Sequence, residues 1–336
     1  MEGLLWSTSI AILATAAIWK GSGWLEDASE QLAAYYGLPA IVQGAIITAI
    51  GSSFPELSST VLSTLLHGEF DLGVGAIVGS AIFNILVIPG MSGLVTERYT
   101  SSRDVVYKEA LFYMLAVASL LLTFALAVIY NPRGGGDLTG EVTRLLVLPL
   151  VGLYGLYVFI QYLDSREYGV PQVKSIRVGR EWIRLVTSLV VIVVAVEGLV
   201  RAALTFGEAF GTPPFLWGLT ILAAATSLPD AFVSVQAARR DEDVTSLANV
   251  LGSNTFDLLV AIPAGVLIAG AAPVDFALAV PMMGVLVIAT VILFSFLRTE
   301  MELTTPEAYS LIVGYALFLC WMILETTGIV RTLPGG

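Results

Sequence analysis

The chain of 336 residues is 57% hydrophobic and only 13% charged, with a mean hydropathy of +0.86. A composition this apolar is typical of a polytopic membrane protein and excludes an ordinary soluble domain. The formal net charge of −11 is spread over short connections, so it indicates neither an acidic tail nor a nucleic-acid partner. The single cysteine, Cys320, excludes an internal disulfide framework.

The apolar runs predict ten membrane-spanning helices. A helical span needs about 20 predominantly apolar residues, and polar or turn-forming segments divide the chain into runs of at least that length. The predicted spans are 4–36, 38–66, 72–94, 105–130, 142–163, 181–210, 213–238, 244–269, 275–297 and 306–327. We therefore predict an all-α membrane protein with about ten transmembrane helices.

A polar motif, Gly51-Ser-Ser-Phe-Pro-Glu56, lies inside the second predicted span. Ionisable side chains inside a membrane are costly and rare, so Glu56 is a candidate functional residue. Pro55 has no N–H and interrupts the helical hydrogen bonds, which leaves backbone carbonyls free. Ser52, Ser53 and Glu56 have a spacing that places them on one helix face. These groups all present oxygen, which suits a hard cation such as Na⁺ or Ca²⁺.

The same motif recurs in the second half of the chain as Ala225-Thr-Ser-Leu-Pro-Asp230, at an offset of 174 residues. Thr226, Ser227 and Asp230 occupy the places of the two serines and the glutamate of the first copy. Paired polar breaks in corresponding halves are the best sequence indication of a transporter binding site at a repeat interface. The recurrence therefore favours a shared cation site over an accident of packing.

A second motif follows each copy, Gly79-Ser-Ala-Ile-Phe-Asn84 and then Gly252-Ser-Asn-Thr-Phe-Asp257. In each, two polar residues are four positions apart and project from the same helix face. They are Ser80 with Asn84 and Ser253 with Asp257. Such residues could simply hydrogen-bond between helices, but a third intramembrane acid has no packing role. We therefore add all four to the predicted site.

Small residues four positions apart precede the polar pairs. Gly75 and Gly79 in the first half, and Ala248 and Gly252 in the second, have the spacing that lets membrane helices approach closely. Close approach would bring the polar pairs to the break in the preceding helix.

Five spans in each half make an odd number, so the second half must cross the membrane with inverted topology. We predict a first repeat over 1–163, a short cytoplasmic linker over 164–180, and an inverted second repeat over 181–330. With the N-terminus outside, the inner connections hold 11 Lys and Arg residues and the outer ones hold 3. Positive residues favour the cytoplasm, which supports this orientation.

The remaining charged residues are interpreted as solvated rather than functional. The long helices carry Glu26, Asp27 and Glu30 in one copy and Glu197, Arg201 and Glu208 in the other. Charges at such places are typical of solvated or interfacial helix ends. His67, Glu69 and Asp71 occupy a turn, where a solvated loop is favoured over a metal site.

In these two motif pairs the chain resembles the cation/Ca²⁺ exchanger superfamily, whose paired repeats carry them. The resemblance implies a transporter rather than an enzyme: a secondary active antiporter that exchanges Na⁺ for Ca²⁺ by alternating access and is electrogenic. It also implies that the two long helices slide across the remaining bundle. No cofactor, nucleic acid or obligatory protein partner is expected. The expected environment is the lipid bilayer of a prokaryotic plasma membrane.

The resemblance also assigns roles to the motif residues. Glu56 and Asp230 would be the central Ca²⁺ carboxylates. Ser52, Thr226 and the backbone carbonyls of Ala49 and Ala223 would complete the cation sites. The flanking Na⁺ sites would be lined by Ser53, Ser80, Asn84, Ser227, Ser253 and Asp257.

Departures from the family pattern leave other readings open. Many members have Glu at the second break and Thr at the first, where this chain has Asp230 and Ser52. Acids at both Asp230 and Asp257 are more similar to the potassium-dependent branch, so K⁺ co-transport is an alternative, as is H⁺/Ca²⁺ exchange. A cation channel could use the same oxygens. An intramembrane aspartyl protease also needs two buried acids, but the flanking hydroxyls suit cation ligation better.

Overall fold

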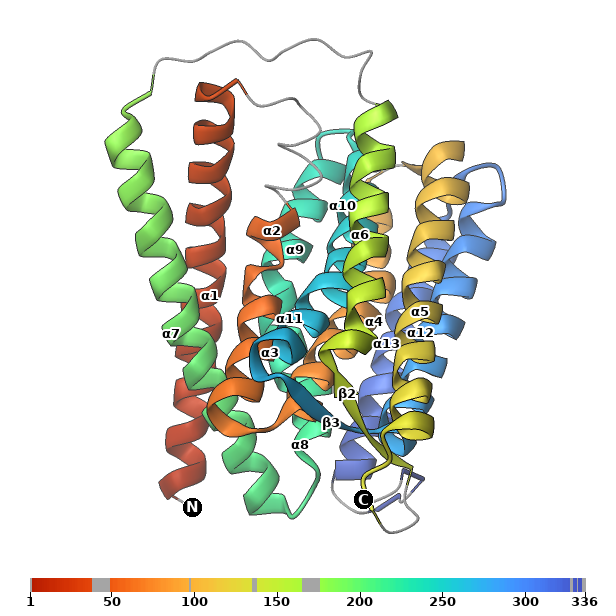
Figure 1. Cartoon of the computed structure of the whole chain (residues 1–336). Coiled ribbons are helices and arrows are strands. Elements are labelled where there is room, and N and C mark those ends of the chain that lie inside the picture. The colour runs from red at the N-terminus through yellow and green to blue at the C-terminus, as the bar shows by residue number, and fades with distance from the viewer. Residues whose placement is uncertain are drawn as a thin grey trace.

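The computed structural model describes residues 2–37, 49–96, 98–134, 138–164, 176–326, 329–330 and 332–333. Within these residues, nine helices are long and apolar enough to cross a membrane (Figure 1). They confirm the predicted all-α membrane fold. The other predicted span, 38–66, lies partly outside the described residues, and its remainder forms α2 (Ala49–Ser52) and α3 (Phe54–His67).

The two long helices α1 (Glu2–Tyr35) and α7 (Val178–Phe210) pack against each other at one flank of the molecule (Figure 1). They run in opposite directions, as inverted repeats require. Their interface is an apolar cluster that includes Ile18 of α1 and Val196 of α7, both fully buried. We call α1 and α7 together the two-helix unit.

The remaining helices form a bundle beside the two-helix unit (Figure 1). After α2 and α3, the first half contributes α4 (Phe70–Val95), the π-helical turn η2 (Asp104–Glu109), α5 (Ala110–Tyr130) and α6 (Arg144–Asp164). The second half contributes α8 (Pro214–Trp217), the π-helical turn η4 (Gly218–Leu222), α9 (Ala223–Ala238), α10 (Asp243–Phe256), the π-helical turn η5 (Asp257–Ala261), α11 (Ile262–Ala269), α12 (Phe276–Leu297) and α13 (Thr305–Thr326). Helix α4 is buried continuously from Leu72 to Leu86. It is therefore the centre of the bundle.

Glycines allow the backbone of α4 to lie directly against the backbone of the second half. A Cβ atom added at Gly75 or Gly79 would collide with the backbone carbonyl of Phe215 or Leu219, respectively. Gly218 is equally confined, against the carbonyl of Leu72. The predicted close approach at Gly75 and Gly79 is confirmed, and it brings Ser80 and Asn84 to the opposite repeat.

Two short antiparallel strand pairs, which the sequence did not predict, tie the halves together. β1 (Tyr99–Thr100) pairs with β4 (Glu302–Leu303), and β2 (Thr139–Thr143) pairs with β3 (Ala271–Asp275). Each pair joins a connection in the first half to a connection in the second. The pairing partners are at least 128 residues apart, so no local pattern indicates them.

Matching aspartates fasten the strands to the starts of α4 and α10. Asp71 accepts a hydrogen bond from the backbone N–H of Asp275 at 3.3 Å. Asp243 accepts from the backbone N–H of Thr100 at 2.9 Å. Asp71 is therefore a structural residue, and its interpretation as a solvated loop residue is wrong.

The helix break is present at the first motif and absent at the second. Helix α2 ends at Ser52 and α3 begins at Phe54, with Pro55 in its first turn. By contrast, α9 runs through Pro229 without interruption. The prediction of a break there is wrong, because the wide π-helical turn η4 lies just before the motif and the helix resumes regular geometry at Ala223. Neighbouring side chains commonly make a proline tolerable inside a membrane helix.

Candidate cation site

Three carboxylates from three helical elements converge at the middle of the bundle. Glu56 lies in the first turn of α3, Asp230 in α9, and Asp257 at the start of η5, and all three have no exposed surface. They are close enough to interact electrostatically. No cationic side chain among the described residues forms an ion pair with them. Buried charges persist only when they are compensated, so a bound cation or bound protons must neutralise these acids.

Helix α4 supplies polar contacts to the acids of both repeats. The hydroxyl of Ser80 donates to Oε1 of Glu56 at 3.3 Å, and Nδ2 of Asn84 donates to Oδ2 of Asp230 at 3.1 Å. The hydroxyl of Ser227 donates to that of Ser80 at 2.7 Å. Two residues of the first repeat therefore hold acids from both repeats in one cluster.

A second contact between the two repeats is made by a pair of serines. The hydroxyls of Ser52 and Ser253 are 3.1 Å apart and join α2 to α10. The hydroxyls of Thr226 and Ser227 also lie within hydrogen-bond distance of the Ala223 carbonyl of their own helix, at 3.3 and 2.8 Å. Each hydroxyl has a second acceptor, the Leu222 carbonyl for Thr226 and Ser80 for Ser227.

Six buried oxygen atoms in this cluster have no hydrogen-bond partner among the described residues. They are Oγ of Ser53, Oε2 of Glu56, Oδ1 of Asn84, Oδ1 of Asp230, and both Oδ1 and Oδ2 of Asp257. Buried polar atoms are nearly always satisfied, and each orphan costs about 1–3 kcal/mol. Across the described residues, no group of three or more His, Cys, Asp or Glu side chains can hold a metal ion by itself. A cation here would therefore need the hydroxyl, amide and backbone oxygens as well.

The structure also adds Asn254, which sequence reasoning missed. Its Oδ1 accepts from Nδ2 of Asn84 at 3.0 Å, and its Nδ2 donates to the carbonyl of Ala81 at 3.3 Å. Asn254 thereby fixes the orientation of Asn84. Its counterpart in the first repeat, at an offset of 173, is Ala81, so recurrence could not reveal it. Its polarity beside Ser253 in an apolar span was the remaining signal.

Two of the predicted ligands are backbone carbonyls, and they differ in how the structure places them. Ala223 begins α9 and is fully buried beside the cluster. Ala49 begins α2, at the edge of the described residues. A role for either carbonyl in binding a cation stays a prediction.

A cavity of about 1010 Å³ approaches the cluster from one side. It is lined by the second half of α1, the end of α9, the first part of α10, and residues of η2, α6 and α7. Pro229, which precedes Asp230 in the chain, and Ser253, whose hydroxyl lies 3.1 Å from that of Ser52, both line this cavity. The cavity therefore extends to residues that border the cluster, while the three acids themselves are buried.

Glu26 lines this cavity and interacts electrostatically with Asp230. The interpretation of Glu26 as a residue at a helix end is wrong, because α1 continues to Tyr35 and Glu26 lines the cavity. Its neighbour Asp27 is paired with Arg184 of α7 at 2.6 Å, which ties the two-helix unit together beside the cavity. The sequence could not separate these roles, because both acids lie on the same polar segment of α1.

Comparisons with known proteins agree with this arrangement. The family model described as "Sodium/calcium exchanger protein" matches residues 6–163 and 181–324. The sodium/calcium exchanger MaX1 of Methanosarcina acetivorans is 25% identical over 347 aligned positions, which cover 92% of this chain and 96% of that protein.

Two solved structures share the fold. A structure of the sodium-calcium exchanger NCX_Mj is 24% identical and has a TM-score of 0.63, covering 94% of this chain and 98% of its own. The crystal structure of the H⁺/Ca²⁺ exchanger CAX is 15% identical with a TM-score of 0.72, covering 96% and 85%. Because the family model spans most of the sequence, the chain belongs to the sodium/calcium exchanger protein family of multi-pass membrane antiporters.

Proposed function

We propose that the protein exchanges Na⁺ for Ca²⁺ across a membrane by alternating access. The observation that carries the proposal is the set of six unpartnered oxygens around Glu56, Asp230 and Asp257. Ca²⁺ takes six to eight oxygen ligands, with carboxylates prominent among them. The name of the relative MaX1, a sodium/calcium exchanger, supports Na⁺ as the coupling ion.

Glu56 and Asp230 are the proposed Ca²⁺ carboxylates, since they are the corresponding acids of the two motif copies and each has one unpartnered oxygen. Ser52, Thr226 and the carbonyls of Ala49 and Ala223 complete the set. The proposed Na⁺ ligands line the flanks: Ser53, Ser80, Asn84, Ser227, Ser253 and Asp257. One Ca²⁺ or several Na⁺ can neutralise the acids, whereas the empty ionised site cannot cross the apolar barrier. This difference couples the two ions.

The two repeats, 1–163 and 181–330, supply the symmetry that alternating access uses. Residues 165–175 of the proposed cytoplasmic linker lie outside the described residues. With the N-terminus outside, the cavity faces the cytoplasm, and the two-helix unit moves against the bundle to switch access. If unequal charge crosses per cycle, the membrane potential contributes about 2.3 kcal/mol per charge per 100 mV, which makes exchange electrogenic.

The test is a gradient exchange in proteoliposomes loaded with Na⁺ and diluted into Na⁺-free buffer containing Ca²⁺. We expect rapid Ca²⁺ uptake that disappears when the internal Na⁺ is replaced by choline. Uptake that follows an imposed H⁺ gradient and ignores Na⁺ would instead favour H⁺/Ca²⁺ exchange. Unitary currents in planar bilayers would favour a channel.

Asp257 raises the question of a second co-transported ion. Its repeat counterpart is the uncharged Asn84, so it adds one negative charge to the cluster. We expect Na⁺-driven Ca²⁺ flux to be indifferent to K⁺, with Asp257 serving Na⁺ or holding a proton. The check is flux with and without K⁺, in the wild type and in Asp257→Asn. A several-fold loss on omitting K⁺, abolished by the substitution, would identify a K⁺-dependent exchanger.

Ser80 and Ser253 should matter less than the acids. In Ser80→Ala, Glu56 loses its neutral hydrogen-bond donor, and such a bond contributes about 1 kcal/mol. We expect the Na⁺ activation curve of Ca²⁺ uptake to shift about fivefold towards higher Na⁺ in either alanine variant. Unchanged Na⁺ activation curves in both variants would remove these serines from the site.

A further inference from the structure

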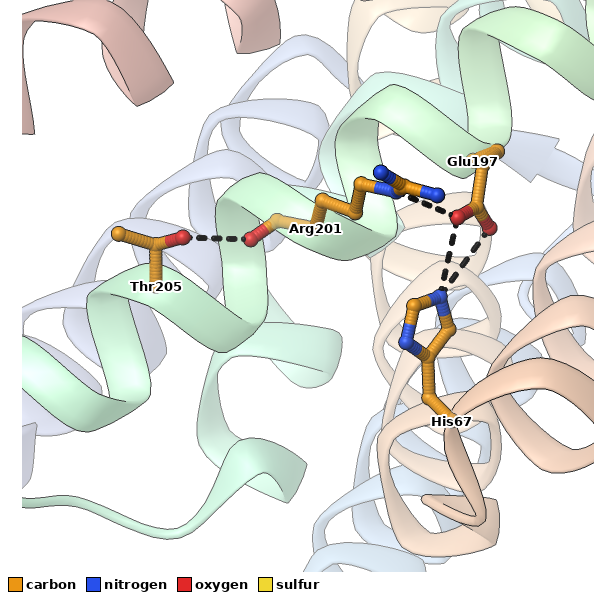
Figure 2. A network of polar contacts seen from close by, with 4 residues as sticks. All are labelled: His67, Glu197, Arg201 and Thr205. Atoms are coloured by element: carbon orange, nitrogen blue, oxygen red, sulfur yellow. Dashed lines mark hydrogen bonds and ion pairs between the residues drawn. The ribbon is translucent and has the colours of Figure 1, made fainter. Parts of the chain in front are cut away.

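A polar contact of His67, Glu197 and Arg201 joins the two-helix unit to the bundle (Figure 2). Nε2 of His67, the last residue of α3, lies 3.1 and 3.2 Å from the two carboxylate oxygens of Glu197 on α7. Arg201, one turn further along α7, donates from Nε to Oε1 of Glu197 at 2.6 Å. The His67 and Glu197 side chains are only 20% and 18% exposed, so this contact is largely shielded from solvent.

The internal repeat identifies the residues in the opposite repeat that correspond to those around the His67–Glu197 contact. Adding the 174-residue offset to positions 23 and 27 gives 197 and 201, and subtracting it from 234 and 241 gives 60 and 67. The corresponding pairs are Gly23 with Glu197, Asp27 with Arg201, Ser234 with Thr60, and Asp241 with His67. Gly23, Asp27 and Ser234 line the open cavity, and Asp241 lies between two lining residues.

On the His67 side the equivalent space is filled. Thr60 is fully buried, and Leu62 packs against the apolar cluster of the two-helix unit that includes Leu199. A Cβ atom at Gly265 of α11 would come within 3.0 Å of the Thr60 side chain. Thr60 and Leu62, the counterparts of the cavity-lining Ser234 and Gln236, are therefore packed against protein on this side.

A polar stripe on α3 leads from the cation site to this contact. Glu56, Thr60, Thr64 and His67 are spaced by four, four and three residues, so they follow one face of the helix. The Thr60 hydroxyl bonds to the backbone carbonyl of Glu56 at 3.2 Å, and that of Thr64 bonds to the carbonyl of Thr60 at 2.6 Å. In the closed state these hydroxyls are satisfied by their own helix.

We propose that the His67–Glu197 contact is a latch that closes the ion pathway on the side opposite the cavity. This proposal rests on the proposed exchange function and goes beyond it by identifying the contact that closes one side of the ion pathway. His67 belongs to the bundle and Glu197 to the two-helix unit, so opening this side separates them. Arg201 positions the Glu197 carboxylate. A ligand or substitution shifts such an equilibrium only by its differential effect on the two states.

Removing the His67–Glu197 contact should favour the conformation that is open on the His67 side. In His67→Ala and Glu197→Ala we expect the apparent Km for Ca²⁺ to fall about two- to fivefold when Ca²⁺ is offered on the His67 side, and to rise when it is offered on the cavity side. Thr205→Ala is the matched control, because its hydroxyl bonds only to the Arg201 carbonyl of its own helix. Equal changes on both sides, or no change, would refute the latch.

A second readout does not depend on ion flux. In a Cys320→Ser background, Leu62→Cys places a thiol at the counterpart of Gln236, which lines the cavity. A membrane-impermeant thiol reagent should label it several-fold faster once Glu197→Ala is added. Equal labelling rates would overturn the latch even in a protein that exchanges ions. Faster labelling in a protein without Na⁺-driven Ca²⁺ flux would retain the latch and reject the proposed function.

Discussion

Replacing Glu56 with Gln is expected to abolish Ca²⁺ exchange while leaving the protein folded. Glutamine conserves the shape of the side chain, and its amide oxygen can still accept from Ser80. Removing one partner of a buried charge pair costs about 3–5 kcal/mol, so Ca²⁺ uptake should fall by about 100-fold or more. Asp230→Asn should behave alike, because Asn84 can still donate to the amide oxygen. Initial rates of Ca²⁺ uptake in proteoliposomes give the measurement.

Asp243→Asn is the matched control for both variants. Asp243 is also a buried acid, with 7% of its surface exposed. It accepts hydrogen bonds from the N–H and the hydroxyl of Thr100, and this contact lies outside the cluster. This variant should keep most of its exchange rate. If Glu56→Gln or Asp230→Asn exchanged Ca²⁺ at nearly the wild-type rate, the assignment of these carboxylates would be wrong.

Gly79→Val is expected to prevent folding rather than to impair ion binding. The added Cβ atom would collide with the carbonyl of Leu219 and lie 2.7 Å from Cβ of Ala223. Overpacking a well-packed core typically costs 1–3 kcal/mol, and a backbone collision at the centre of the bundle should cost about 3 kcal/mol or more. We expect little monodisperse protein after solubilisation, with a markedly lower Tm for what remains.

Gly314→Val provides the comparison for this packing prediction. Gly314 lies in α13, and a Cβ atom added there meets no atom of the described residues within 4 Å. Its yield and Tm should stay near the wild-type values. If Gly79→Val were equally stable, the contact between α4 and the second half would not be as close as described.

The recurrence of two motifs made the centre of the site predictable. Glu56 and Asp230 could be proposed as site residues because an acid inside an apolar span has few structural explanations and here occurs twice. Apart from 38–66, which lies partly outside the described residues, the predicted helix ranges lie within a few residues of those in the structure. The length of an apolar run and the presence of an acid inside it are local properties of the chain, so a single sequence reveals them.

Features that depend on contacts between distant segments could not be predicted in this way. Asn254 lacks a polar counterpart in the first repeat, and Asp27 differs from Glu26 by its ion pair with Arg184 of α7. The break expected at Pro229 is absent, and the irregular turn is η4, where Gly79 of α4 and Leu219 approach closely. The partner of His67 is 130 residues away on α7.

The most direct test of the central claim is calcium binding to the solubilised protein at increasing Na⁺. Because both ions are proposed to share the carboxylates of Glu56 and Asp230, the apparent Kd for Ca²⁺ should rise steeply as Na⁺ increases, and choline should have no such effect. Ca²⁺ binding should also be lost in Glu56→Gln. Tight Ca²⁺ binding that ignores Na⁺, or that survives in Glu56→Gln, would contradict a shared cation site at the repeat interface.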